Sequence, residues 1–426
     1  MVSLYATNTG NDSLQSYFNR IDEIIKKKDQ YPIAFLDTEF LMGAKESATG
    51  KEKVDLLLQL YSAYVYISRE EAFRYNEEAK QLSKNIGFKK GQLQAAYNTA
   101  YLMFVRGEFD EAFYEILEIE KDLKGMPFME IKADITTLKS DIYTERGEYD
   151  KALELGLGLL QVAENTADDY MLMRAYAALS HYYLRIGNYP KARSYCLQGL
   201  DYIIKLKKTE YFYHKINEIA RMTAKIEGPE RALEVYSFFF KLEEKMAPPG
   251  DYVQSITYMI LSDIYMSIDK LDQAQDYLSK ALILNYKNDF RFRIPRALIQ
   301  QAELHLKQED TLNAILNYKK SIEAAERINA FDVMKSSSAI LSQMYRHSNQ
   351  FSKSFEYQTL HSAIVDSLFT NEQDQKIKIL EAKQSIKEMS QQKQILELKN
   401  KAQQGRYNSI ATLVACLFFL CCLMLY

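Results

Sequence analysis

The pattern of apolar, small and polar positions along this chain repeats about every 40 residues, a length that suits two helices and their connections. The clearest copies begin at Gly107, Gly147 and Gly187, and each has an aromatic residue two positions on and an alanine five positions on. This frame extends in both directions, at steps of 40 with one step of 42, through the small residues Ala72, Ala112, Ala152, Ala192, Ala232, Ala274, Ala314 and Ser354. The period predicts a linear array of similar helical units.

A second series of small residues lies twelve positions upstream of the first, with Leu60 as the one exception. Its other members are Ala100, Ser140, Ser180, Ala220, Ser262, Ala302 and Ser342. Small residues on two antiparallel helices let their backbones approach closely, and a large neighbouring ring then fills the remaining gap. Tyrosines follow three positions after several of these residues, so we expect much of the tyrosine content to be core packing.

These motifs resemble the tetratricopeptide repeat, in a long variant of 40 residues, over about Lys53 to Leu368. The resemblance implies an all-α fold, a right-handed superhelical solenoid of about eight helix pairs, which we place at residues 51–368. It further implies a concave groove, lined by the first helix of each pair, that holds a peptide or a partner protein. Catalysis is not typical of this family.

Composition and motifs exclude several other classes of protein. The 54 basic and 57 acidic residues nearly cancel, so the chain has no overall field that would attract nucleic acid. Three of the four cysteines lie in the last eleven residues, which leaves no metal-spaced cluster in the body of the chain. Phosphate-loop, dinucleotide, metalloprotease and nucleophile-elbow motifs are missing from the sequence. We therefore predict a protein that is not an enzyme, holds no cofactor or metal and binds no nucleic acid directly.

The C-terminal part differs from the repeats. Residues 407–426 contain no charged residue and predict a transmembrane helix. Residues 369–406 predict a helical linker, either a weak dimeric coiled coil through 379–396 or a lone solvated helix. Its heptad positions are Ile379, Ala382, Ile386, Met389 and Leu396.

The N-terminal residues 1–50 predict the remnant of a signal peptide followed by capping helices, the first at about Asp12 to Lys28. The two ends suggest different topologies. A signal remnant places the repeats outside the cytoplasm, whereas Lys399, Lys401 and Arg406 place them inside. We predict a single-pass protein of an inner membrane with extracytoplasmic repeats, and cytoplasmic repeats are the alternative. This arrangement resembles bacterial membrane-anchored tetratricopeptide sensors and regulators.

Candidate binding residues come from three positions of the first helix, spaced i, i+7 and i+11, that share one face. In consecutive repeats these positions hold an acidic row and two basic rows: Asp134, Asp141 and Glu145; Arg174, His181 and Arg185; His214, Arg221 and Lys225. One interpretation is ion pairing between neighbouring helices. The other is a groove patch in which arginines accept the carboxylate or phosphate of a partner.

An aromatic row precedes these charged rows, at Gln94, Tyr97, Tyr101 and Phe104. It suits either the anchoring of an apolar side chain of a ligand or packing against the next helix. The leading hypothesis is therefore a membrane-anchored repeat protein that binds a peptide or protein in its groove and serves as the sensory or regulatory part of a bacterial signalling system. A passive, tail-anchored assembly scaffold or chaperone adaptor is the alternative.

Overall fold

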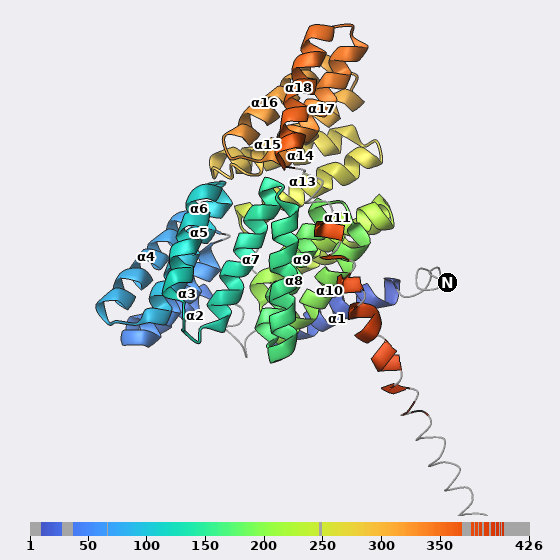
Figure 1. Ribbon diagram of the computed structural model, residues 1–426. Coiled ribbons are helices and arrows are strands. Elements are labelled where there is room, and N and C mark those ends of the chain that lie inside the picture. The colour runs from blue at the N-terminus through green and yellow to red at the C-terminus, as the bar shows by residue number, and fades with distance from the viewer. Residues whose placement is uncertain are drawn as a thin grey trace, which may run out of the picture. The chain divides into compact units, whose positions relative to one another are not determined.

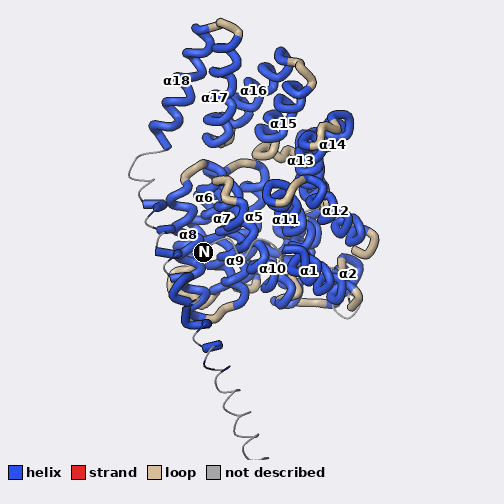
Figure 2. The backbone as a smooth tube through the Cα atoms, turned by 90° about the vertical axis from the view of Figure 1, so that its right-hand side faces the viewer, coloured by secondary structure: helices blue, strands red, loops and turns tan. Residues whose placement is uncertain are grey.

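In a computed structural model, the structure describes residues 10–27, 37–65, 67–246 and 249–368, and part of 376–403. Over these residues the regular elements are helices (Figure 2). Their bounds are α1 Gly10–Ile25, α2 Thr38–Ser47, α3 Gly50–Tyr64, α4 Arg69–Asn85, α5 Lys89–Arg106, α6 Phe109–Asp122, α7 Met129–Arg146, α8 Tyr149–Thr166, α9 Asp169–Arg185, α10 Tyr189–Lys205, the 3-10 helix η2 Thr209–Tyr211, α11 Phe212–Ile226, α12 Pro229–Glu243, α13 Asp251–Ser267, α14 Leu271–Lys287, α15 Ile294–Lys307, α16 Thr311–Glu326, α17 Phe331–His347 and α18 Phe351–Leu368.

The helices from α3 to α18 form consecutive pairs, each made of an odd-numbered helix and the even-numbered helix that follows it (Figure 1). The pairs coincide with the 40-residue units of the sequence. This confirms the predicted all-helical, tetratricopeptide-like solenoid.

Both series of small residues lie in the contact between the two helices of a pair. Ala72, Ala112 and Ala192 of the even helices are fully buried, and so are Ala100 and Ala220 of the odd ones. Where the odd helix carries serine, its hydroxyl donates to the carbonyl oxygen twelve residues later, at 2.9–3.1 Å, in the pairs Ser140–Ala152, Ser180–Ala192, Ser262–Ala274 and Ser342–Ser354. A small residue therefore permits the close approach, and serine adds a buried hydrogen bond across it.

In most units the turn between the helices of a pair contains one residue with a positive φ. Gly107, Gly147 and Gly187 supply it, with φ between 76° and 83°. In later units Asp269, Glu309 and Asn349 take the same position with φ of 57–62°. Asn and Asp tolerate this conformation better than most residues. The same turn therefore forms in later units that lack glycine at this position.

The superhelix brings units that are far apart in sequence into contact. A Cβ atom added to Gly107 would lie 3.2 Å from the backbone nitrogen of Phe292 and 3.2 Å from Cγ2 of Ile328. Close by, Arg291 Nη1 lies 3.7 Å from Glu108 Oε1. The turn between α5 and α6 therefore packs against the connectors before α15 and α17.

Helix α1 lies within the predicted N-terminal segment, and it packs against distant repeats. Phe18 stacks on Phe238 of α12 at a centroid distance of 4.2 Å. Tyr17 Oη and Arg20 Nη1 donate to the two carboxylate oxygens of Asp201 in α10, at 2.9 and 2.6 Å. The sequence pattern identified the helix and its apolar face without revealing this location.

The predicted membrane location is corrected by the structure. Among the helices that the structure describes, none is both long and apolar enough to cross a membrane. The segment 407–426 and the predicted signal remnant at 1–9 lie outside the described residues.

The chain divides into two compact units, Met1–Thr370 and Asn371–Tyr426. In the second unit Met389 and Leu396 are exposed, and the heptad positions Ile379, Ala382 and Ile386 lie outside the described residues. A homodimer through 379–396 therefore stays a prediction.

Candidate functional site

A groove of about 380 Å³ lies on the inner face of the first unit. Its lining residues come from the odd-numbered helices α3, α5, α7, α9, α11 and α13, from η2, and from the connector before α15. The first helix of each pair thus forms the concave surface. Because the connector before α15 meets the α5–α6 turn, the groove is bounded by residues from early and later repeats.

The structure brings together most of the residues that the repeat frame selects. The groove is lined by Tyr97 and Tyr101 of α5, Asp141 of α7, Arg174, His181 and Arg185 of α9, and His214 and Arg221 of α11. Lys225, the remaining candidate, is exposed at the end of α11 and does not line it. Whether these residues bind a ligand stays a prediction.

Asp134, Asp141 and Glu145 of α7 and Arg174, His181 and Arg185 of α9 form what we call the paired side of the groove. At its lower end Arg174 Nε lies 2.9 Å from Asp134 Oδ1, and Tyr170 Oη donates to the same oxygen at 2.8 Å. Thr137 of α7 also donates to the backbone carbonyl of Arg174, at 3.3 Å. Burial raises the pKa of Asp134, and the positive charge of Arg174 opposes that rise.

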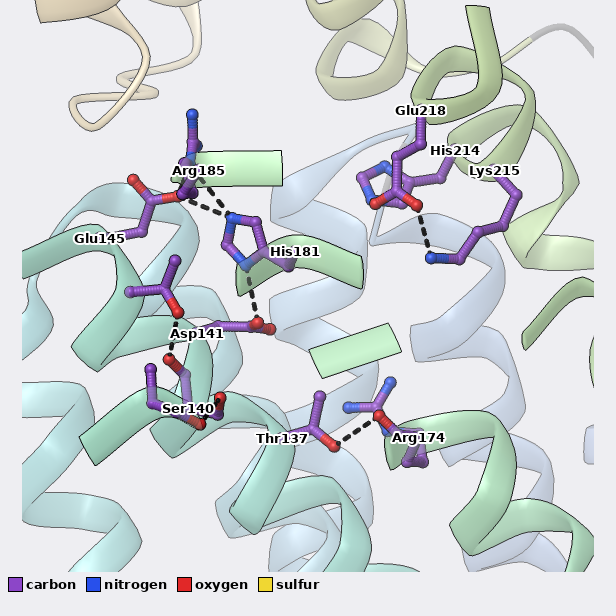
Figure 3. Close-up of polar contacts among 12 residues, drawn as sticks. Thr137, Ser140, Asp141, Glu145, Arg174, His181, Arg185, His214, Lys215 and Glu218 are labelled. Carbon is purple, nitrogen blue, oxygen red and sulfur yellow. Dashed lines mark hydrogen bonds and ion pairs between the residues drawn. The ribbon is translucent and has the colours of Figure 1, made fainter. Parts of the chain in front are cut away.

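His181 occupies the middle of the paired side, between two carboxylates (Figure 3). Its Nδ1 lies 2.8 Å from Asp141 Oδ1, and its Nε2 lies 3.0 Å from Glu145 Oε1. Burial lowers the pKa of this imidazole, but the two carboxylates outweigh burial and raise the pKa to about 9. At neutral pH His181 is therefore protonated and donates from both ring nitrogens.

Glu145 connects the paired side to α15. Its side chain is almost fully buried; Arg185 Nε donates to its Oε1 at 3.0 Å, and Arg296 Nη2 of α15 lies 2.7 Å from its Oε2. Burial raises the pKa of Glu145, yet Arg185, Arg296 and His181 hold that pKa well below its ordinary value. A buried carboxylate with three cationic partners stays ionised and links three helices.

A smaller ion-pair group lies on α11. Lys215 Nζ is 2.6 Å from one carboxylate oxygen of Glu218, and His214 Nε2 is 3.3 Å from the other (Figure 3). Burial raises the pKa of Glu218, but Lys215 and His214 lower it far below its ordinary value. His214 is thus paired within its own helix, and the predicted basic row of α11 reduces to Arg221 within the groove.

Arg221 and Arg293 form what we call the open side of the groove. Neither side chain forms a hydrogen bond or ion pair with the residues that the structure describes. The sequence frame missed Arg293, because it lies in the connector before α15 and outside the helix positions that the frame compares. The signal that could have revealed it is the alternation Phe290, Arg291, Phe292, Arg293 at a boundary between repeats.

An aromatic wall continues from α5 to the open side. Ring centroids are 6.4 Å apart for Tyr97 and Tyr101, 6.3 Å for Tyr101 and Phe104, and 5.6 Å for Phe104 and Phe292. We call these four residues the aromatic wall. The predicted aromatic row thus faces the groove and also packs against a distant connector.

The comparisons with known proteins agree with this architecture. The model of the tetratricopeptide repeat family matches residues 256–288, which span most of α13 and all of α14. No curated protein matches the chain.

Two solved structures with TM-scores above 0.5 have a similar fold. A Rap protein complexed with Competence and Sporulation Factor is 11% identical, with a TM-score of 0.53, and the alignment covers 85% of this chain and 99% of that one. NprR in complex with its cognate peptide NprX is 18% identical, with a TM-score of 0.51, and the alignment covers 79% and 98%. At these identities the similarity establishes a shared tetratricopeptide-like repeat fold.

Catalytic or metal chemistry has no visible support in this groove. In the described part of the chain, no group of three or more His, Cys, Asp and Glu side chains is arranged to hold a metal ion. The buried carboxylates of the groove are engaged by cations, so they are poor general bases. The arrangement suits binding, and the prediction that the protein is not an enzyme stays a prediction.

Proposed function

We propose that this protein is a regulatory protein that binds a peptide, or an extended segment of a partner protein, in the groove. The observation that carries this proposal is the groove itself, in which an aromatic wall and charged side chains converge from most of the repeats. Its volume lies within the roughly 300–1,000 Å³ typical of sites that enclose a small ligand. Its lining combines aromatic and aliphatic side chains with many charged and polar ones, which suits a ligand that carries both kinds of group.

The similar fold of two structures solved with bound partners supports the proposal. One of these was solved with Competence and Sporulation Factor and the other with the peptide NprX. For this chain we propose the same kind of partner, without transferring either ligand. Because the groove is bounded by early and later repeats, a ligand that touches both stabilises their mutual arrangement, and its binding then changes the surface offered to other proteins.

The test is selection of ligands from a random heptapeptide library displayed on phage. We compare the whole protein with the double variant Tyr97→Ala/Tyr101→Ala, which removes half of the aromatic wall. The matched control is Tyr114→Ala, because Tyr114 is an exposed tyrosine on α6 that does not line the groove.

We expect the unaltered protein and the Tyr114→Ala control to enrich the same peptides, and the double variant to lose them. Circular dichroism checks that all three proteins keep their helix content. If the double variant enriches the same peptides as the unaltered protein, the ligand does not bind in this groove and the proposal is wrong.

A further inference from the structure

The groove holds more cationic than anionic groups once paired charges are set aside. Each of its six carboxylates forms an ion pair with another described residue: Glu130, Asp134, Asp141, Glu145, Glu210 and Glu218. Arg221 and Arg293 have no such partner in the described chain. Partly buried arginines without a partner are unusual, because guanidinium groups taken out of water are normally paired.

The electrostatic surroundings of Arg221 are unfavourable for a cation. Burial lowers the pKa of its guanidinium, and the nearby charges of Arg185 and Arg293 lower that pKa further. Asp263 of α13 acts in the opposite direction, but it forms no ion pair with Arg221 and does not line the groove. Three arginines that repel one another in a partly dehydrated groove would be stabilised by an anion between them.

Arg293 is held in place by aromatic rings. Its guanidinium carbon lies 4.3 Å from the ring centroid of Tyr252 and 4.7 Å from that of Phe292. Stacking on a ring face fixes the plane of the guanidinium and leaves its N–H groups free to donate. Its Nε is buried and has no hydrogen-bond partner among the described residues.

The same rings connect this arginine to the aromatic wall. Phe292, on which Arg293 stacks, also contacts Phe104 at a centroid distance of 5.6 Å. An anion bound at Arg293 therefore adjoins the surface that accepts an apolar side chain. The arginine site and the aromatic wall together favour a ligand that carries an anionic group next to an apolar side chain.

We propose that Arg221 and Arg293 together bind a carboxylate of the peptide in the groove, while an aromatic or large apolar side chain beside that carboxylate packs against the aromatic wall. The inference rests on the proposed peptide-binding function and names its ligand class, an acidic peptide with an adjoining apolar residue. The carboxylate comes from the C-terminus or from an Asp or Glu side chain of the ligand. Both sources offer the planar pair of oxygens that an arginine binds bidentately.

Calorimetric titration with small probes tests the site without knowledge of the natural ligand. N-acetyl-phenylalanine carries a terminal carboxylate, and its amide is the neutral counterpart. The dipeptide N-acetyl-Phe-Asp-amide carries a side-chain carboxylate, and N-acetyl-Phe-Asn-amide is its neutral counterpart. The proteins are the unaltered chain, Arg221→Met, Arg293→Met and the control Arg327→Met, since Arg327 is exposed and lies outside the groove.

We expect at least one acidic probe to bind the unaltered protein and the Arg327→Met control more tightly than its neutral counterpart does. Either groove substitution should weaken that binding roughly ten- to hundredfold, the range for losing one charge-assisted hydrogen bond. The neutral probes should be nearly unaffected. The preference between the two acidic probes identifies the source of the carboxylate.

Three results would overturn the inference. They are equal affinity of acidic and neutral probes, acidic-probe binding that survives both groove substitutions, and binding of inorganic phosphate that excludes the carboxylate probes. If peptide selection succeeds while any of these holds, the groove binds peptides by other means and only this inference fails. If no probe binds and selection also fails, the proposed function fails with it.

Discussion

Both sides of the groove carry arginines, but the two sides differ in whether those charges have a partner within the protein. On the paired side, each cation of α9 meets a carboxylate of α7, and Glu145 extends the network to α15. On the open side, Arg221 and Arg293 face the groove without a partner in the described chain. The presence of charged side chains in a groove therefore does not by itself indicate where a ligand binds. The paired side holds the superhelix together, and the open side is where we expect a ligand.

The largest expected effect comes from breaking the paired side at its centre. Glu145→Ala leaves His181, Arg185 and Arg296 in a buried site without their shared carboxylate. Removing one member of a buried ion pair costs about 3–5 kcal/mol of unfolding free energy. Urea unfolding followed by circular dichroism measures the loss.

The matched control for that substitution is Glu118→Ala, which removes a surface partner of Lys121. Its effect on the unfolding free energy should stay within about 0.5 kcal/mol. If the two substitutions cost the same, the network around Glu145 does not hold the superhelix together.

The pH dependence of stability offers a second test of the paired side. The pKa of His181 is raised from about 6.5 to about 9 on folding. The protonated imidazole therefore stabilises the fold fully below pH 6.5, and this stabilisation is lost as pH rises through 9. Each pKa unit corresponds to about 1.4 kcal/mol, so the contribution is on the order of 3 kcal/mol.

The measurement compares the unaltered protein with His181→Gln from pH 6 to 9.5. The difference in their unfolding free energies should be largest at pH 6 and shrink steadily above it. His347→Gln, which removes a histidine at the end of α17, is the control and should change the unfolding free energy little. A constant difference for His181→Gln would show that Asp141 and Glu145 do not hold its proton.

Replacing one arginine on each side should change the unfolding free energy differently. Arg174→Met leaves Asp134 buried without its cation and should reduce the unfolding free energy by about 2–3 kcal/mol. Arg221→Met removes a charge that burial and two other arginines oppose, so stability should be unchanged or rise by up to about 1 kcal/mol. Thermal unfolding of both variants checks this, and equal losses would show that Arg221 is a structural residue like Arg174.

The smallest effect concerns how the open side is positioned. Gly107→Ala and Gly187→Ala both place a side chain at a left-handed backbone, which costs about 1–2 kcal/mol. Only at Gly107 does the added Cβ meet other residues, Phe292 and Arg291 among them, at 3.2–3.3 Å. Gly107→Ala should therefore cost about 1 kcal/mol more of unfolding free energy than Gly187→Ala. Of the two substitutions, only Gly107→Ala should weaken binding of the acidic probe. Equal effects on stability and binding would show that this contact does not position Arg293.

The sequence predicts the paired side because its partners lie one repeat apart. Asp141 with His181 and Glu145 with Arg185 are each separated by 40 residues, so the period places them at the same height on adjacent helices. The small-residue series predicts the helix contacts for the same reason. Both kinds of contact lie within one repeat or between adjacent repeats, so the period of the sequence is enough to predict them.

The repeat frame selected Arg221 of the open side, but Arg293 and the position of α1 could not be predicted in this way. The contact of Glu145 with Arg296 and that of Phe104 with Phe292 depend on the pitch of the superhelix. Small rotations accumulate over several repeats to give that pitch, and no short pattern in the chain encodes it. The membrane prediction came from a segment without repeats, 407–426, and the helices that the structure describes gave it no support.

The packing of the Gly107 turn against the connector at Phe292 bears on how this chain folds. An open solenoid has contacts only between neighbouring repeats, so its units can form and melt in sequence. Here residues separated by about 185 positions touch, and closing so long a loop costs entropy before the contact forms. Once formed, the contact ties the melting of the early repeats to that of the later ones. We therefore expect the units from α5 to α17 to unfold together, as one cooperative body.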